Sequence, residues 1–341
     1  MADLHHFVPR VHLRMFSDCP NRRRIGLYNF KSDIYIEKAS LRHQAGLNNF
    51  YESKFVEEAL AEIEAAYGSN LKYMIEAERI PHPGSDQHMA LLQYITLQRQ
   101  RIPSTIKEGE LMLDASLKGF LMSKGISQQV LDTVVLKQTH TQIASILAVD
   151  EEYPLMKDLE IRLLRNETGK SFFTSDVPVI FYNQLFEKKS IQIGGSGIGA
   201  LGFQAVFPIS PTHALLLYDP SVYNVRSQGA LCVIKREGDV ENINKLQVVN
   251  ARNHLYFPSK SLHQIRMIVP KYRRRREDNL THFVKIRHPQ VSDRKVEAVA
   301  RIERQCRFKL SFISIRPQYI RIPMYDGEVY LRPGINPSEY V

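Results

Sequence analysis

The 341-residue sequence contains no tryptophan and only three cysteines, which are Cys19, Cys232 and Cys306. The cysteines lie far apart and do not form the closely spaced pair that begins a zinc site, and they predict a reducing compartment. No apolar run reaches the roughly 18 residues that a membrane-spanning helix requires. We therefore expect a soluble, cytoplasmic protein that does not enter a membrane.

The sequence also lacks the common signatures of nucleotide-binding and hydrolytic enzymes. It contains no GxxxxGK[ST], GxSxG or HExxH motif and no kinase signature. The stretch GIGALG at residues 197–202 matches GxGxxG, but a strand-like segment, FQAVFPIS, follows it instead of a helix. We interpret this stretch as a loop between two strands and do not expect a dinucleotide site.

Positive charge is abundant and concentrated in one segment. The formal net charge is +10, and residues 266–322 contain sixteen Lys and Arg against five Asp and Glu. The candidate nucleic-acid-binding cations in this segment are Lys271, Arg273, Arg274, Arg275 and Arg276. Aromatic residues are interleaved with the cations, a combination that grips phosphates and stacks bases. Two interpretations remain open: a solvated charged loop, and a surface that binds RNA or DNA.

Apolar spacing predicts an α+β fold, in which a helical region packs on a mostly antiparallel β-sheet. Apolar residues recur every three or four positions from Phe55 to about Glu78, which indicates an amphipathic helix. We expect an N-terminal segment with a small β-hairpin over 1–53, a helical region over 54–150, and a β-rich region with a basic C-terminal segment over 151–341. The hairpin is expected at 25–38, and one further helix near 292–307.

The opening stretch LHHFVPRVHLRMF contains three histidines. His5 and His6 are adjacent, so their side chains point apart, which argues against both binding one ion. If Pro9 begins a helix, His6 lies just before the helix N-terminus. A neutral His6 could act as a ligand or a general base, and a histidine hydrogen-bonded into a cap is an equally simple alternative.

Three charged residues of the helical region are further candidates. Glu57 and Glu64 are seven residues apart and share a line on the predicted helix, where they could hold a cation, act as acid and base, or be solvated. Arg101 shares a line with apolar residues of the next helix, so we expect it to be covered. A covered arginine needs an anionic partner, either a structural carboxylate or a substrate phosphate.

Asp176 ends the strand-like segment KSFFTSD. An aspartate at a strand end can accept backbone N–H groups as a turn residue, or it can hold a metal or act as a base. Pro178 follows closely, which favours the turn.

Several of these segments together resemble one family. HHFVPRVHLRMF, LAEIEAAYGSNL, LQRQRIPS, FFTSDVPV, FPISP and VVNARNHLYF are similar to segments of the bacterial and phage-associated DUF4238 family (domain of unknown function 4238). The similarity extends along most of the chain. It departs at His12, where the family more often has tyrosine.

The resemblance implies which polar residues are typical of the family: His6, Glu64, Arg101, Ser175, Asp176 and Asn250. A set of His, Glu, Arg and Asp is of the kind used in phosphodiester cleavage. We expect a nucleic-acid-directed enzyme, a nuclease of phage defence or toxicity, with His6, Glu64 and Asp176 as base or metal ligands and Arg101 as phosphate ligand. A divalent metal, Mg or Mn, would suit this set. The alternative is a non-catalytic nucleic-acid-binding or regulatory module.

Overall fold

The computed structural model describes residues 4–51, 54–135, 139–192, 197–227, 229–277, 283–287, 297–301, 306–325 and 328–336. The side chains of residues 276–277, 283–287 and 297–301 lie outside this description.

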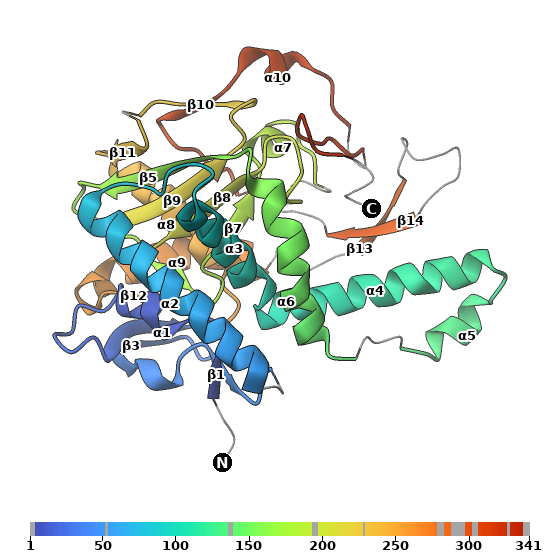
Figure 1. Cartoon of the computed structure of the whole chain (residues 1–341), viewed down its shortest axis with the longest axis horizontal. Coiled ribbons are helices and arrows are strands. Elements are labelled where there is room, and N and C mark those ends of the chain that lie inside the picture. The colour runs from blue at the N-terminus through green and yellow to red at the C-terminus, as the bar shows by residue number, and fades with distance from the viewer. Residues whose placement is uncertain are drawn as a thin grey trace.

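Two β-sheets form the centre of the protein (Figure 1). The larger sheet has the strand order β11, β5, β9, β8, β7, with bounds β5 (Glu160–Asn166), β7 (Ile180–Tyr182), β8 (Gln204–Pro208), β9 (His213–Tyr218) and β11 (Leu231–Ile234). The smaller sheet has the order β3, β2, β12, β6, with bounds β2 (Arg24–Asn29), β3 (Ile34–Ser40), β6 (Thr174–Ser175) and β12 (His254–Phe257). Among these pairings only β5 with β11 is parallel, so the predicted mostly antiparallel sheet and α+β class are confirmed.

Six short strands form three further antiparallel pairs. They are β1 (Leu4–His6) with β4 (Gly46–Asn48), β10 (Tyr223–Val225) with β15 (Ile313–Ile315), and β13 (Phe283–Arg287) with β14 (Glu297–Arg301).

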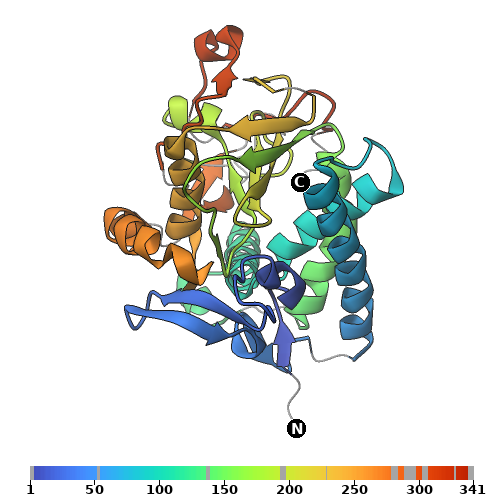
Figure 2. The ribbon, with the colours of Figure 1, turned by 90° about the vertical axis from the view of Figure 1, so that its left-hand side faces the viewer.

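The helices lie on both sides of the sheets. Their bounds are α1 (Arg10–Arg14), α2 (Lys54–Ala77), α3 (Asp86–Gln100), α4 (Pro103–Ser123), α5 (Gln128–Asp132), α6 (Thr141–Glu152), α7 (Gln184–Lys188), α8 (Glu237–Asn250), α9 (Leu262–Glu277) and α10 (Pro317–Arg321), with short 3-10 turns at Leu41–His43, Tyr153–Met156 and Ser259–Ser261. Figure 2 shows α2, α3 and α6 on one side and α8 and α9 on the other. In Figure 1, α4 extends away from the body and carries α5 at its far end. The helix predicted from Phe55 to about Glu78 is confirmed as α2.

Strand β9 shows why both faces of the larger sheet are covered. Its sequence HALLLY is buried at every position. Leu215 and Leu217 pack with residues of α2 and α3, whereas Ala214 and Leu216 pack with residues of α8. Successive side chains of a strand point to opposite faces, so a continuous apolar run requires cover on each side.

The hairpin predicted at 25–38 is confirmed as β2 and β3, and it joins the rest of the chain through β12. Strands β2 and β12 lie close together at Gly26, where an added Cβ would be 2.5 Å from the Phe257 ring. Only glycine fits there without moving the ring.

The helix predicted near 292–307 is wrong in the part that the structure describes. Residues Glu297–Arg301 form β14, which pairs with Phe283–Arg287. The β13 sequence FVKIR is rich in β-branched and aromatic residues, and pairing with it outweighs the local helical pattern. No helix within the described ranges is both long enough and apolar enough to cross a bilayer.

Candidate functional site

A cavity of about 650 Å³ lies between β1, α1 and α2. The titratable residues that line it are His5, His6, Arg10, Arg14, Tyr51, Glu57, Glu64 and Lys72. Helix α1 comes close to α2 at Gly68, where an added Cβ would lie 3.2 Å from Val11. The cavity therefore brings together His5, His6 and the two glutamates of the predicted helix.

His6 is held in one tautomer. Its Nδ1 lies 2.9 Å from the carbonyl oxygen of Gln44, which can only accept, so Nδ1 carries the proton. Burial lowers the pKa of His6; the hydrogen bond to Gln44 opposes this shift, and the Arg10 cation adds to it. The ring is therefore neutral near pH 7, with Nε2 as its unprotonated nitrogen, which is the form a general base requires.

His5 has the opposite arrangement. Its Nδ1 accepts the backbone N–H of Tyr51 at 3.1 Å, and its Nε2 lies 3.4 Å from a carboxylate oxygen of Glu57. The imidazole also stacks on the Tyr51 ring, with 5.5 Å between centroids. As predicted, the two rings have different partners, although both border the same cavity. Because its acceptor nitrogen is occupied, His5 serves to hold the strand and Glu57 in place.

Glu64 links the cavity to a buried arginine. Arg101 is fully buried, and its Nη1 donates to Glu64 Oε1 at 2.7 Å while its Nε donates to Gln98 Oε1 at 3.1 Å. The prediction that Arg101 is covered and has an anionic partner is confirmed, and the partner is a structural carboxylate. Burial lowers the pKa of Arg101, but Glu64 together with Tyr51 and Tyr94 more than offsets this, so the guanidinium stays charged. In this arrangement Arg101 orients Glu64 and does not reach a substrate phosphate, which corrects its predicted role.

Two cations that face the cavity were missed by the sequence analysis. Arg10 and Arg14 lie on α1, four residues apart, and both are exposed and line the cavity. Residues at i and i+4 share one face of a helix. The spacing in VPRVHLR is thus the signal that could have identified them.

His12 does not line the cavity but anchors α1 to the body. It is fully buried, with Nδ1 3.2 Å from the Tyr67 hydroxyl and Nε2 3.0 Å from Thr174 Oγ1. Burial lowers the pKa of His12 to about 3, and the Arg101 cation contributes to the shift. His12, which departs from the family pattern, thus links α1 to α2 and β6, and its ring is neutral.

Asp176 lies outside the cavity lining, so the structure does not bring it to His6 and Glu64. Its carboxylate accepts the backbone N–H groups of Arg252, Asn253 and His254 at 2.8, 2.6 and 3.1 Å. Burial raises the pKa of Asp176, and these three hydrogen bonds oppose the rise. The prediction of a base or metal ligand gives way to the turn interpretation, because three N–H groups occupy both oxygens.

The other two family-typical residues are also internal. Ser175 Oγ lies 2.7 Å from Gln247 Oε1 and 2.9 Å from the carbonyl oxygen of Val177. Asn250 Nδ2 donates to the carbonyl oxygen of Leu246 at 2.9 Å at the end of α8. Ser175 therefore links β6 to α8, whereas the Asn250 side chain bonds within α8.

The arginine run continues helix α9 and is not a loop. Lys271 Nζ lies 2.5 Å from Glu241 Oε1, Arg273 Nη1 lies 2.7 Å from Asp33 Oδ2, and Arg275 donates to the carbonyl oxygen of Cys306 at 3.2 Å. Arg274 and Arg275 are exposed, and the Arg276 side chain lies outside the described residues.

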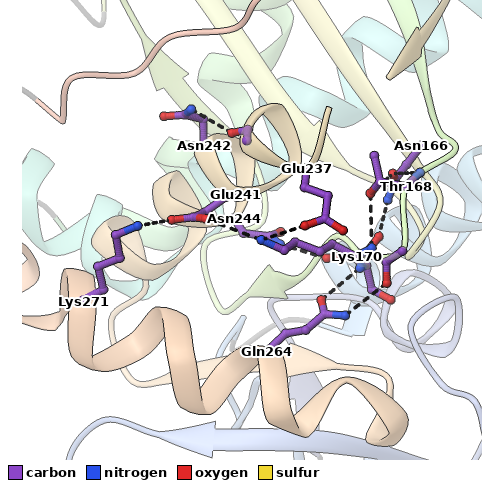
Figure 3. A network of polar contacts seen from close by, with 12 residues as sticks. Asn166, Thr168, Lys170, Glu237, Glu241, Asn242, Asn244, Gln264 and Lys271 are labelled. Atoms are coloured by element: carbon purple, nitrogen blue, oxygen red, sulfur yellow. Dashed lines mark hydrogen bonds and ion pairs between the residues drawn. The ribbon is translucent and has the colours of Figure 1, made fainter. Parts of the chain in front are cut away.

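A second, smaller cavity of about 230 Å³ lies beside α9. Figure 3 shows Lys271 and Lys170 reaching Glu241 from opposite sides. Asn244 and Gln264 bind the backbone of Ser171 there. The ionic groups of this cavity are thus paired within the protein.

The described ranges contain no group of three or more His, Cys, Asp or Glu side chains arranged to hold a metal ion. The groups that line the cavity are two imidazoles, two carboxylates and three cations.

Comparison with known proteins gives one match. The model of the family described as "Protein of unknown function (DUF4238)" matches residues 4–261. No curated protein and no solved structure matches. The matched range includes every residue that lines the 650 Å³ cavity, and it ends before the arginine run of α9. Since it covers well over half of the sequence, the chain belongs to the DUF4238 family.

Proposed function

We propose that the chain is a nuclease that cleaves phosphodiester bonds in the 650 Å³ cavity, with His6 as the general base. One observation carries this proposal: His6 is fixed as a neutral ring with its proton on Nδ1, at the wall of a cavity that also presents two arginines. A neutral imidazole accepts a proton from an attacking hydroxyl group, and arginine stabilises the charge that develops on phosphate.

The remaining residues of the cavity support this chemistry. Arg10 and Arg14 lie on one face of α1, and Lys72 approaches from α2, so cations border the space from two walls. Arg101 fixes the Glu64 carboxylate beside them. The Glu64 charge favours the imidazolium that forms when His6 accepts a proton.

The basic end of α9 supports recruitment of a polyanion. Figure 2 places α9 on the side of the sheets opposite to α2, so a nucleic acid that contacts both must be longer than the few nucleotides that fill the cavity. We assign the exposed Arg274 and Arg275 to recruitment and the cavity to cleavage. The biological setting that we propose is phage defence or toxicity.

Replacement of His6 tests the proposal. His6→Asn retains an N–H that can donate to Gln44 but has no basic nitrogen, so we expect cleavage of nucleic acid to fall by about 10²- to 10⁴-fold while affinity is retained. The measurement is the single-turnover rate on labelled RNA and single-stranded DNA, together with binding by anisotropy. If the protein is a toxin, expression of the native chain should arrest growth, and expression of His6→Asn should not.

His43→Asn is the matched control, because His43 is exposed and lies outside the cavity lining. Equal cleavage by the native protein and His6→Asn would overturn the assignment of His6 as the general base. Retained affinity with no cleavage by either protein would support the alternative of a non-catalytic nucleic-acid-binding module.

A further inference from the structure

The cavity that holds His6 is sized for a small part of a nucleic acid. Pockets that enclose small molecules range from about 300 to 1,000 Å³, and this one has about 650 Å³. Duplex DNA presents its phosphates on the outside of a wide, stiff rod. A single strand can place one or two nucleotides in such a cavity, whereas a stiff duplex can approach it only with its outer phosphates.

Cleavage of RNA and cleavage of DNA require different groups from the cavity lining. Cleavage of DNA requires a water molecule or another external nucleophile to be bound and activated. RNA carries its own nucleophile, the 2′-hydroxyl, next to the phosphorus, and such proximity replaces much of the entropic cost of bringing reactants together. Cleavage of RNA therefore needs a base for one proton and cations for one phosphate, and the cavity presents both.

We propose that the substrate is single-stranded RNA, cleaved by attack of its own 2′-hydroxyl after proton transfer to His6 Nε2. This inference rests on the proposed function and adds the substrate class. The 2′-oxygen forms a bond to phosphorus, the bond from phosphorus to the 5′-oxygen breaks, and the leaving oxygen takes a proton from water in the open cavity. The products are a 2′,3′-cyclic phosphate and a 5′-hydroxyl, and the imidazolium of His6 returns its proton to solvent.

The positions of the cations agree with this route. Arg10 and Arg14 can hold the non-bridging oxygens of one phosphate from α1, as planar guanidinium groups do in bidentate contacts. Lys72, on α2, borders the same space and can contact a neighbouring phosphate. Glu57, which His5 holds, adds a negative charge to the wall, and that charge restricts where the phosphates can lie.

The experiment uses the full chain and three labelled oligonucleotides of one sequence. The first is DNA with one ribonucleotide, the second carries a 2′-O-methyl group at that nucleotide, and the third is DNA throughout. We expect cleavage only of the first, directly after the ribonucleotide, with a cyclic phosphate end detected by mass spectrometry. Annealing a complementary strand is expected to reduce the rate by at least about tenfold.

The outcomes separate this inference from the proposed function. Comparable cleavage of all three oligonucleotides, or linear phosphate as the first product, would overturn the RNA route while the nuclease proposal stands. If none is cleaved, and RNA throughout is also intact, both fall. Cleavage of the ribonucleotide substrate that is lost in His6→Asn but retained in His43→Asn supports both.

Discussion

The three histidines of the N-terminal segment differ in their hydrogen-bond partners, and these partners determine which ring nitrogen is available. His6 donates from Nδ1, so Nε2 is its unprotonated nitrogen, whereas His5 accepts at Nδ1 and cannot become a base on that side. His12 is enclosed between Tyr67 and Thr174 and stays neutral. Three histidines within eight positions therefore have three separate roles, and only His6 presents an unprotonated nitrogen for chemistry.

The burial of His12 predicts that stability falls in mild acid. In the unfolded chain its pKa is close to 6.5, and in the folded protein it is about 3, so the unfolded state binds more protons between these values. Stability is thus retained above pH 6.5 and lost as the pH falls toward 3. We expect His12 to account for about 2 kcal/mol of the loss in unfolding free energy between pH 7 and pH 5.

Urea unfolding at the two pH values checks this expectation. His12→Gln removes the titration and keeps an amide near the same partners, so its unfolding free energy should depend less on pH than that of the native protein. An identical pH dependence in both proteins would contradict the assignment.

At the scale of elements, the site is built from short pieces that other elements hold. Strand β1 has three residues and α1 has five, too few for either to be stable alone. Strand β1 is paired with β4, and α1 is tied through His12 to β6. The turn after α8 is tied in the same way, by the three hydrogen bonds to Asp176.

Asp176 therefore acts on stability. Asp176→Ala leaves three backbone N–H groups at the start of β12 without their acceptor, and we expect a loss of about 3 kcal/mol in the free energy of unfolding. Asp176→Asn retains one amide oxygen and should lose less. Denaturant unfolding measures both.

A contrary outcome would restore the role predicted from the sequence. If Asp176→Asn keeps its stability yet abolishes cleavage, the carboxylate takes part in the chemistry.

Local patterns identified the elements better than the contacts between them. The apolar period gave α2, and the paired β-rich runs gave the hairpin of β2 and β3, because each depends on neighbouring residues. The partners of Asp176 lie 76 to 78 residues away, and no local pattern encodes them. Arg101 was expected to need an anion, but only the packing of α2 against α3 decides that the anion is Glu64 and not a phosphate.

At the scale of the whole molecule, helix α2, which lines the cavity, and the basic helix α9 lie on different sides of the sheets (Figure 2). A short substrate can occupy the cavity without touching α9. Under the proposed function, a long strand would reach both and gain affinity through two separate sets of contacts.

Substrate length therefore decides whether the arginines matter. In the variant Arg274→Ser with Arg275→Ser, we expect weaker binding of a strand of about 40 nucleotides, and a slope of log affinity against log salt that is smaller by about 1 to 1.5. Cleavage of a tetranucleotide should be unchanged. Binding titrations at several salt concentrations measure the slope.

The matched control is Lys107→Ser with Lys124→Ser, which removes two exposed charges at the two ends of α4. An equal effect of both double variants would show that only the net charge matters. A loss of tetranucleotide cleavage in the arginine variant would place α9 at the cavity.

The anchoring of α1 also has a consequence for synthesis of the chain. Thr174 lies 162 positions after His12, and its two-residue strand exists through pairing with β12, which is made later still. At roughly 5–20 residues per second, the ribosome needs on the order of tens of seconds to bridge that interval. Arg10 and Arg14 emerge first but receive their support last. The walls of the cavity are therefore not fully supported until β12 has been synthesised, about three quarters of the way along the messenger.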